Sequence, residues 1–197
     1  TIAIVLNLFY DYEGQRQDLI RYMRETENQL QILLCELAAY LHNKDMEINV
    51  WDRIIAFEGR MHEFIKAAYD YQDNTFHSHP GYYIDYFEMR LAQLQVLHNL
   101  HYEIKKIRKM PKQALVIADY IMYMADYVVE MNIPDQQIEK LEEISEQMKQ
   151  EELPKTREEF EGRALLYHIL MDLEEFLVYK KRFVSGLDEK KLRIYWK

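Results

Sequence analysis

The sequence has few of the residues that bend or end regular structure: its 197 residues include 5 glycines and 4 prolines. This scarcity excludes a fold of many short strands joined by turns and favours an all-α fold. Cysteine is scarcer still, because Cys35 is the only one, which excludes an internal disulfide and fits a reducing compartment. The length suits one domain with a sizeable core.

Positive charge is also in short supply, with 25 Lys and Arg residues against 34 Asp and Glu residues and a net charge of −9. Binding to a nucleic acid begins with neutralising its phosphates, so we expect no nucleic-acid partner. The sequence also lacks a Gly-rich phosphate loop, a nucleophile elbow and a Cys/His pair with catalytic spacing. We therefore expect a protein that is not an enzyme.

What is abundant, namely Leu, Ile, Met, Glu and Tyr, recurs with the 3.6-residue period of helices. The clearest helix covers 157–184, since Thr156 can cap its first turn, Glu159 can reach back to the cap's own amide, and Gly186 can end it. Its wide apolar stripe can be satisfied only by packing against several other helices.

The same periodicity predicts an antiparallel bundle of about five or six helices, in which the bundle domain covers residues 10–186. The long helices are expected near 11–42, 50–72, 80–109 and 157–184. A further helix near 112–131 is apolar on most of its circumference and is expected to be central, whereas an acidic one near 134–150 is expected at the surface. Residues 187–197 form a charged tail whose apolar end, Ile194 to Trp196, needs a surface to pack on.

Several ionisable side chains fall inside or beside the apolar stripes, where a lone charge is costly. One interpretation is a divalent metal, because carboxylates and imidazoles from facing helices build dimetal bundles. The pairs Glu58–His62 and His168–Asp172 have i,i+4 spacing, which allows a shared ion but differs from the usual Glu-x-x-His. The metal candidates are Glu27, Glu58, His62, His168 and Asp172.

The favoured alternative needs no cofactor. Arg90 also lies on an apolar stripe, and a guanidinium can bind one or two of these carboxylates in a forked geometry and fix the helix register. A third interpretation is a pocket for an aromatic carboxylate, in which Tyr83, Tyr86 and Tyr167 supply rings and Arg90 supplies the counter-ion. Rings with a polar tip suit half-buried helix seams equally well.

Three segments resemble the C-terminal cytoplasmic domain of the aromatic acid exporters of Gram-positive bacteria. They are LPKTREEFEGRALLYHILMDLEEFL (Leu153 to Leu177), YYIDYFEMRLAQLQVL (Tyr82 to Leu97) and MPKQALVIADYI (Met110 to Ile121). The opening IVLNLFY (Ile4 to Tyr10) is similar to the junction at which the last membrane helix of that family ends. Residues 1–9 are too few to cross a bilayer, so we expect them to be the exit of a preceding membrane segment or the start of the first helix.

The resemblance implies a non-catalytic domain on the cytoplasmic side of the cell membrane, serving assembly, gating or regulation of an exporter. Its implied partners are the membrane domain of the same polypeptide and, in a homo-oligomer, further copies of the chain. The resemblance carries over no catalytic or binding residue. The alternatives are a ligand-sensing domain and a carboxylate/histidine metal bundle.

Overall fold

A computed structural model describes the backbone of residues 2–43, 49–74 and 81–196, and the side chains of these ranges from Tyr12 onward. Within them all regular structure is helical, which confirms the all-α prediction. The helices are α1 (Ile2–His42), α2 (Val50–Asp73), α3 (Gly81–Lys106), α4 (Ala114–Ala125), α5 (Asp135–Lys149), α6 (Arg157–Ser185) and α7 (Glu189–Tyr195).

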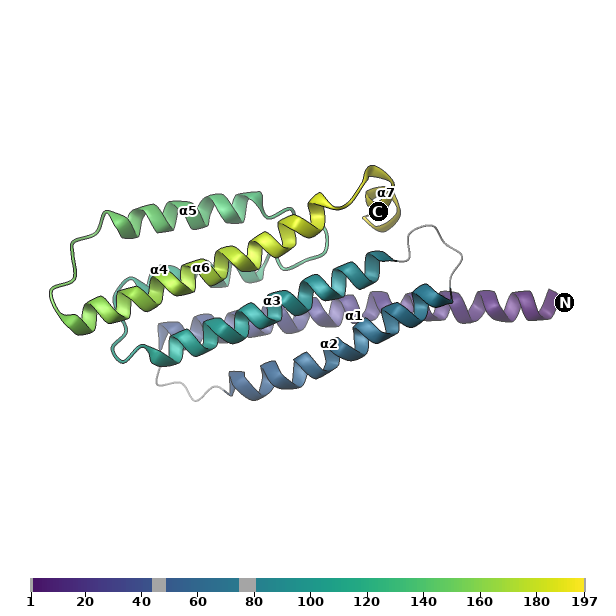
Figure 1. The fold of residues 1–197 in the computed structure, drawn as a ribbon, viewed down its shortest axis with the longest axis horizontal. Helices are drawn as coiled ribbons and strands as arrows, with labels where there is room; N and C mark the ends of the chain where they lie inside the picture. The colour runs from purple at the N-terminus through teal and green to yellow at the C-terminus, as the bar shows by residue number, and fades with distance from the viewer. Residues whose placement is uncertain (1, 44–48, 75–80, 197) are drawn as a thin grey trace.

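The long helices lie side by side along one axis and form the predicted bundle (Figure 1). Helix α3 packs against α1, α2 and α6, and α1 packs against α2, α3 and α4. Helix α5 lies on the outside, against α6 and α4. The N-terminal part of α1 extends beyond the other helices (Figure 1), so the first helix is longer than the part of it that packs in the bundle.

The predicted helix bounds agree with the observed ones to within a few residues except at the start of α1, which is Ile2 rather than near residue 11, and at α4. Helix α7 was not predicted as a helix: it forms in the charged tail, where the Asp188 side chain accepts a hydrogen bond from the Lys191 amide at 2.7 Å and caps the first turn. This brings the helices of the described ranges to seven, one or two more than predicted. The tail packs as expected at Tyr195 and Trp196, which are half-buried against the core.

The start of α6 shows the predicted capping box in a slightly different form. The Thr156 hydroxyl accepts a hydrogen bond from the Glu159 amide at 3.1 Å. The Glu159 carboxylate accepts a bond from the amide of Lys155, at 2.9 Å, one residue before the expected amide of the cap itself. Both interactions satisfy amides that the first turn leaves without helical partners, so α6 begins where the sequence predicts.

Helix α4 corrects the prediction of a central helix near 112–131. It ends at Ala125, and turns follow it. One side of the helix is buried, at Ala114, Ile117, Ala118 and Ile121, but Leu115, Val116 and Met122 are exposed on the opposite side. Helix α4 packs on α1 and α5, and neither covers the side on which Leu115, Val116 and Met122 lie. The apolar circumference of α4 therefore belongs to a helix with one uncovered side, and not to a central helix.

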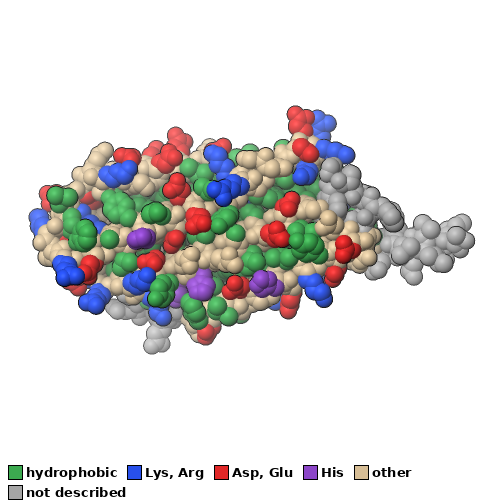
Figure 2. Space-filling model, viewed as in Figure 1, with side chains coloured by type: hydrophobic (Ala, Val, Ile, Leu, Met, Phe, Trp, Pro, Cys, Tyr) green, Lys and Arg blue, Asp and Glu red, His purple; other side chains and the backbone are tan. Residues whose placement is uncertain are grey.

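The surface mixes charges of both signs. Figure 2 shows acidic and basic side chains interspersed over one face of the molecule, with apolar side chains between them.

On α2 the buried stripe consists of Val50, Ile54, Phe57, Met61, Phe64, Ala68 and Tyr71. Glu58 and His62 each follow a member of this stripe by one residue, and so they lie at its edge and on the exposed side, respectively.

Candidate functional site: a buried charged cluster

Arg90 is the largest fully buried side chain of the molecule, with 1% of its surface exposed, near the middle of α3. Its Nη1 donates to Oε1 of Gln93, one turn further along the helix, at 2.9 Å. Gln93 in turn donates from Nε2 to the backbone carbonyl oxygen of Phe176 on α6, at 2.8 Å. The guanidinium is therefore oriented by an amide side chain that is itself held by the neighbouring helix.

The counter-charge of Arg90 comes from α1. Nη2 of Arg90 lies 3.6 Å from Oε1 of Glu27, a carboxylate with 17% of its side chain exposed. Tyr86 donates from its hydroxyl to the same oxygen at 3.1 Å, and the guanidinium carbon lies 5.1 Å from the centre of the Tyr86 ring. Burial raises the pKa of the Tyr86 hydroxyl, and Arg90 opposes this shift, so Tyr86 remains a donor.

Lys180 on α6 is a second buried basic side chain, with 3% of its surface exposed. Its Nζ donates to the backbone carbonyl oxygen of Glu130, in the segment between α4 and α5. Burial and, to a smaller extent, the positive charge of Arg90 lower the pKa of Lys180 to about 6, against the opposing effect of Glu27 and Glu130. Burial therefore disfavours the charged form of this amine.

Glu130 connects the buried charges to the C-terminal end of the described chain. Its carboxylate accepts a hydrogen bond from the Tyr82 hydroxyl, and burial raises the pKa of the Glu130 carboxyl. The Tyr82 hydroxyl accepts a bond from Nε1 of Trp196 at 3.1 Å, and the Tyr195 ring stacks on the Tyr82 ring at 3.8 Å. We call Glu27, Arg90, Gln93, Glu130 and Lys180 the Arg90 cluster.

Residues 16–181 match the model of a protein family described as "Putative aromatic acid exporter C-terminal domain". The chain belongs to this family. The match covers most of the sequence and every member of the Arg90 cluster, which confirms the resemblance seen in the sequence.

This exporter-family domain is also similar to two other proteins. It is 25% identical over 193 residues to the uncharacterized protein YqjA of Bacillus subtilis (strain 168), and the alignment covers 97% of this chain but 58% of that protein. It is 23% identical to a chain in a crystal structure of a putative membrane protein from Clostridium difficile 630, with a TM-score of 0.77 over 86% of this chain and 98% of that one. The second likeness shows that the fold is shared. Within the described ranges, no helix combines the length and apolar character that crossing a membrane requires.

The structure brings together two of the four residues predicted to bind an aromatic carboxylate. Arg90 and Tyr86 are in contact. Tyr83 instead packs its ring edge-on against Tyr71 and Tyr195, with centroids 5.6 and 5.5 Å apart. Tyr167 lines a groove between α5 and α6, away from the ring contacts of α3. The tyrosines of this exporter-family domain thus form helix seams rather than one pocket.

Of the one or two carboxylates predicted to bind Arg90 in a forked geometry, the structure shows one, Glu27, and the fork itself is not formed. One branch of the guanidinium faces Glu27, and the other donates to the amide of Gln93. An amide oxygen can accept a hydrogen bond without bringing a second charge into the core, which lowers the cost of burying the group. The register of α3 against α6 is set by the Gln93 bond to Phe176.

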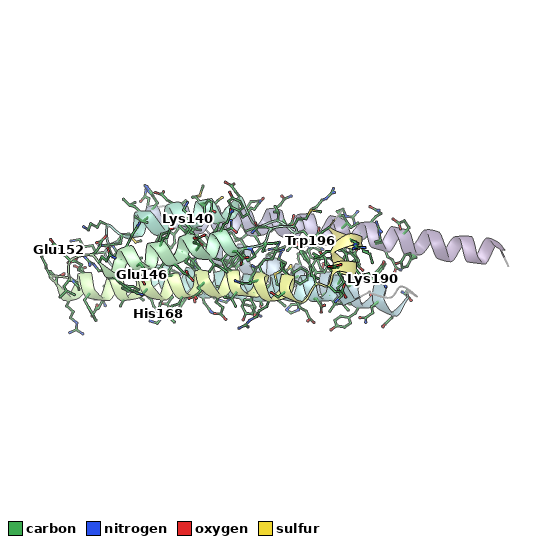
Figure 3. All side chains as sticks on the ribbon, turned by 90° about the horizontal axis from the view of Figure 1, so that it is seen from above. Lys140, Glu146, Glu152, His168, Lys190 and Trp196 are labelled. Carbon is green, nitrogen blue, oxygen red and sulfur yellow. The ribbon has the colours of Figure 1, made fainter. Side chains whose placement is uncertain are left out.

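The five metal candidates are not assembled into one site. Glu27 faces Arg90, Glu58 lies at the edge of the buried stripe of α2, and His62 lies on the exposed side of that helix. His168 projects outward from α6 (Figure 3), while Asp172 is half-buried, its pKa raised to about 6 by burial and by Glu103 and Glu175. In the part of the chain that the structure describes, no three His, Cys, Asp or Glu side chains lie close enough to hold a metal ion.

The sequence analysis missed Gln93, Glu130 and Lys180. Lys180 had a readable signal, because it follows Phe176 by four residues and precedes Phe183 by three, on the apolar stripe of α6. A lysine at such a position usually extends its amine to solvent, so the pattern alone does not predict a buried amine. Glu130 lies in the turns after α4, where no periodicity exists to indicate burial.

Proposed function

We propose that this chain is a non-catalytic domain on the cytoplasmic side of a membrane exporter of aromatic acids, and that it regulates transport by gating the membrane part. Membership of the exporter family supports the association with a membrane protein. The chain spans 58% of the length of its Bacillus subtilis relative, which leaves room in such a protein for membrane helices. The buried cations and carboxylates hold one another in place, which supports a structural role for them over a catalytic one.

The continuity of α1 is the observation that carries the proposal. The helix has 41 residues and is about 60 Å long at 1.5 Å per residue. Its first part extends beyond the bundle (Figure 1), and its later part contributes Leu30, Leu33, Leu34 and Leu37 to the core. A rotation or tilt that begins at the apolar N-terminal end would reach the bundle without passing through a hinge.

Gly14 gives a sharp test, because it lies on the exposed side of α1 close to the point where packing begins. A Cβ atom added there meets no other atom within 4 Å. Gly14→Pro breaks the helix and Gly14→Ala strengthens it by about 1 kcal/mol, so the two variants form a matched pair. We expect Gly14→Pro to lower the export of 4-hydroxybenzoate from cells that express the full-length protein, and Gly14→Ala to preserve it.

The control is the unfolding of the 197-residue chain carrying each substitution, which should remain cooperative in both variants because residue 14 lies outside the buried core. Deletion of the whole domain provides the opposing outcome. Full-length protein that lacks residues 16–181 and exports at the unaltered rate would show that the domain does not gate transport.

Assembly is the second candidate function, and the exposed apolar side of α4 favours it. Leu115, Val116 and Met122 lie there, in the described part of the chain, without a covering helix. Sedimentation of the 197-residue chain tests this function. A monomer at all concentrations would exclude self-association through α4, and a dimer that Met122→Glu disrupts would support it.

A further inference from the structure

A small pocket lies next to the Arg90 cluster, between α3, α6 and the segment that joins α4 to α5. Its polar lining comes from Arg90, Gln93, Asn132, Gln137 and Lys180. These side chains carry two cationic groups and three amides, and among the described residues no carboxylate lines the pocket. The space left for a water-sized sphere is about 10 Å³, enough for about one water molecule or one small polar atom.

The cationic groups in this lining have unused hydrogen-bond donors. Nε and Nη2 of Arg90 have no hydrogen-bond partner, because the 3.6 Å separation between Nη2 and Glu27 is an ion pair too long to be a hydrogen bond. Nζ of Lys180 makes one hydrogen bond, to the carbonyl oxygen of Glu130, although an ammonium group has three protons to donate. Buried donors of this kind are costly to leave unpaired.

The outer part of the pocket is apolar. Tyr127, Met124 and Pro134 contribute to its wall, and Tyr127 is itself exposed, which places this part of the lining at the rim. Basic hydrogen-bond donors next to an exposed aromatic wall suit a molecule with an anionic head and an apolar body. A negative charge in the pocket would also favour the protonated form of Lys180, whose pKa burial lowers to about 6.

We propose that this pocket binds the carboxylate group of a small organic acid, with Arg90 and Lys180 as its two cationic contacts. The proposal that the acid is aromatic rests on the proposed function in an aromatic acid exporter, whereas the carboxylate site rests on the lining alone. One oxygen of the head group takes the place of the one water that the pocket admits, and the other oxygen and the ring lie at the rim, against Tyr127. A monovalent inorganic anion shares the charge of the head group and lacks the ring.

The site has a built-in connection to the C-terminal segment. Nζ of Lys180 lies 5.6 Å from the centre of the Trp196 ring, and Trp196 also bonds to Tyr82, which bonds to Glu130. Anion binding that charges Lys180 therefore changes the electrostatic surroundings of Trp196. Because the chain has two tryptophans, Trp51→Phe leaves Trp196 as the sole reporter of the site by fluorescence.

The test is a titration of the Trp51→Phe chain at pH 6 with sodium benzoate, sodium acetate and sodium chloride, and with uncharged benzamide as the control. We expect benzoate to change the Trp196 emission with saturation at millimolar concentration, acetate to bind about tenfold more weakly, and benzamide to have no effect. Calorimetry on the unsubstituted chain should show the same dissociation constant. Absence of a response to benzoate at 10 mM, about the limit for a specific site of this size, overturns the proposal.

Lys180→Met and Lys181→Met separate the site from its surroundings. Methionine keeps the length and packing of Lys180 without the charge, and Lys181 is an exposed neighbour that pairs with Asp135 at 3.0 Å. We expect benzoate affinity to fall at least about tenfold in Lys180→Met and to be unchanged in Lys181→Met. Unchanged affinity in a folded Lys180→Met chain contradicts the assignment.

The pH dependence of benzoate affinity distinguishes a lysine that contacts the anion from a lysine that has only a structural role. Benzoate affinity should rise as the pH falls from 7.5 to 5.5, and this rise should vanish in Lys180→Met. The charged groups that face Lys180 are Arg90 from α3, Glu27 from α1 and Glu130 from the segment after α4.

Equal affinity for chloride and benzoate would overturn the aromatic acid as the ligand. Binding is measured on this chain and export on the full-length protein, so either proposal can fail alone.

Discussion

Two of the arginine–glutamate pairs that join α1 to its neighbours differ in their surroundings rather than in their chemistry. Arg60 of α2 lies 3.3 Å from Glu25, with 46% and 37% of their side chains exposed. Arg90 of α3 lies 3.6 Å from Glu27, two residues further along α1, with 1% and 17% exposed. The shorter separation belongs to the exposed pair.

The comparison shows that separation is a poor guide to what a charged pair contributes. Around Arg60, water satisfies whatever Glu25 and Glu63 leave unpaired, and a surface pair contributes at most about 1 kcal/mol. Around Arg90 no bulk water is available, so the contacts of Gln93 and Tyr86 are needed to make burial possible. The buried pair is a condition for the packing of α1, α3 and α6, whereas the exposed pair is an addition to it.

The largest effect is expected from Arg90→Ala. The substitution leaves Glu27 without its counter-ion and Gln93 Oε1 without its donor, and it opens a cavity the size of a guanidinium. Removing one partner of a buried pair costs about 3–5 kcal/mol, and the partial exposure of Glu27 places the expected loss near the lower end, at about 3 kcal/mol. Urea unfolding measures it. A loss below about 1 kcal/mol would make the two pairs equivalent and defeat the comparison.

The burial of Arg90 could be predicted from the sequence, but its partners could not. Helical periodicity places Arg90 on the same face as Leu94 and Leu97, and all three are buried. Which carboxylate and which amide contact Arg90 depends on how α1 and α6 are rotated about their axes, which no single helix encodes. The fold could therefore be predicted in outline, while the candidate site depends on contacts between helices.

The place of a side chain relative to the buried stripe of its helix decides whether it belongs to the candidate site. Glu58 is predicted inside or beside the apolar stripe of α2, and it lies at the edge of that stripe, next to Phe57. Lys180 lies on the buried stripe of α6. A shift of one residue turns a side chain by 100°, which is enough to move a carboxylate from a core to a rim.

His101 extends the comparison to a buried base without a counter-ion. It lies on α3 with 4% of its surface exposed, neither ring nitrogen has a hydrogen-bond partner, and the nearby rings are Tyr40 and Trp51, 6.0 and 6.2 Å away. His101→Phe keeps a ring of similar size and removes two unpaired nitrogens, so we expect a gain of about 1–2 kcal/mol in unfolding free energy at pH 7.

His98→Phe is the matched control, because His98 lies one turn before His101 and is only half-buried against Trp51. Its effect should stay within about 0.5 kcal/mol. If His101→Phe instead destabilised the chain, the ring nitrogens of His101 would have to be satisfied in solution, and the contrast with Arg90 would be lost.

The pH dependence of stability tests whether His101 is buried without a counter-ion, and the expected change in unfolding free energy is about 1 kcal/mol. Burial lowers the pKa of His101 below its ordinary value of 6.5, and the positive charges of Lys105 and His98 act in the same direction. Below pH 6.5 the unfolded chain therefore binds a proton that the folded chain resists, and stability falls as the pH falls, by at most about 1.4 kcal/mol per pH unit for one proton.

Urea unfolding at several pH values between 7.5 and 5 isolates this contribution as the difference between the unsubstituted chain and His101→Phe. The stabilising effect of the substitution should grow as the pH is lowered, while the contributions of Lys180 and Asp172, which also titrate near pH 6, are common to both chains and cancel. A difference that is constant with pH would mean that His101 titrates as it does in the unfolded chain.

Arg60→Ala should have the smallest effect, because water replaces the contacts that the substitution removes. We expect a loss below about 1 kcal/mol, part of it from the packing of the guanidinium over the Phe64 ring at 4.8 Å. The electrostatic part should fade between about 0.02 and 0.5 M sodium chloride, since salt screens exposed charges. The loss in Arg90→Ala should depend much less on salt, because burial leaves Arg90 1% and Glu27 17% exposed and weakens the screening of this pair. If Arg60→Ala were as costly and as insensitive to salt, exposure would not be what distinguishes the two pairs.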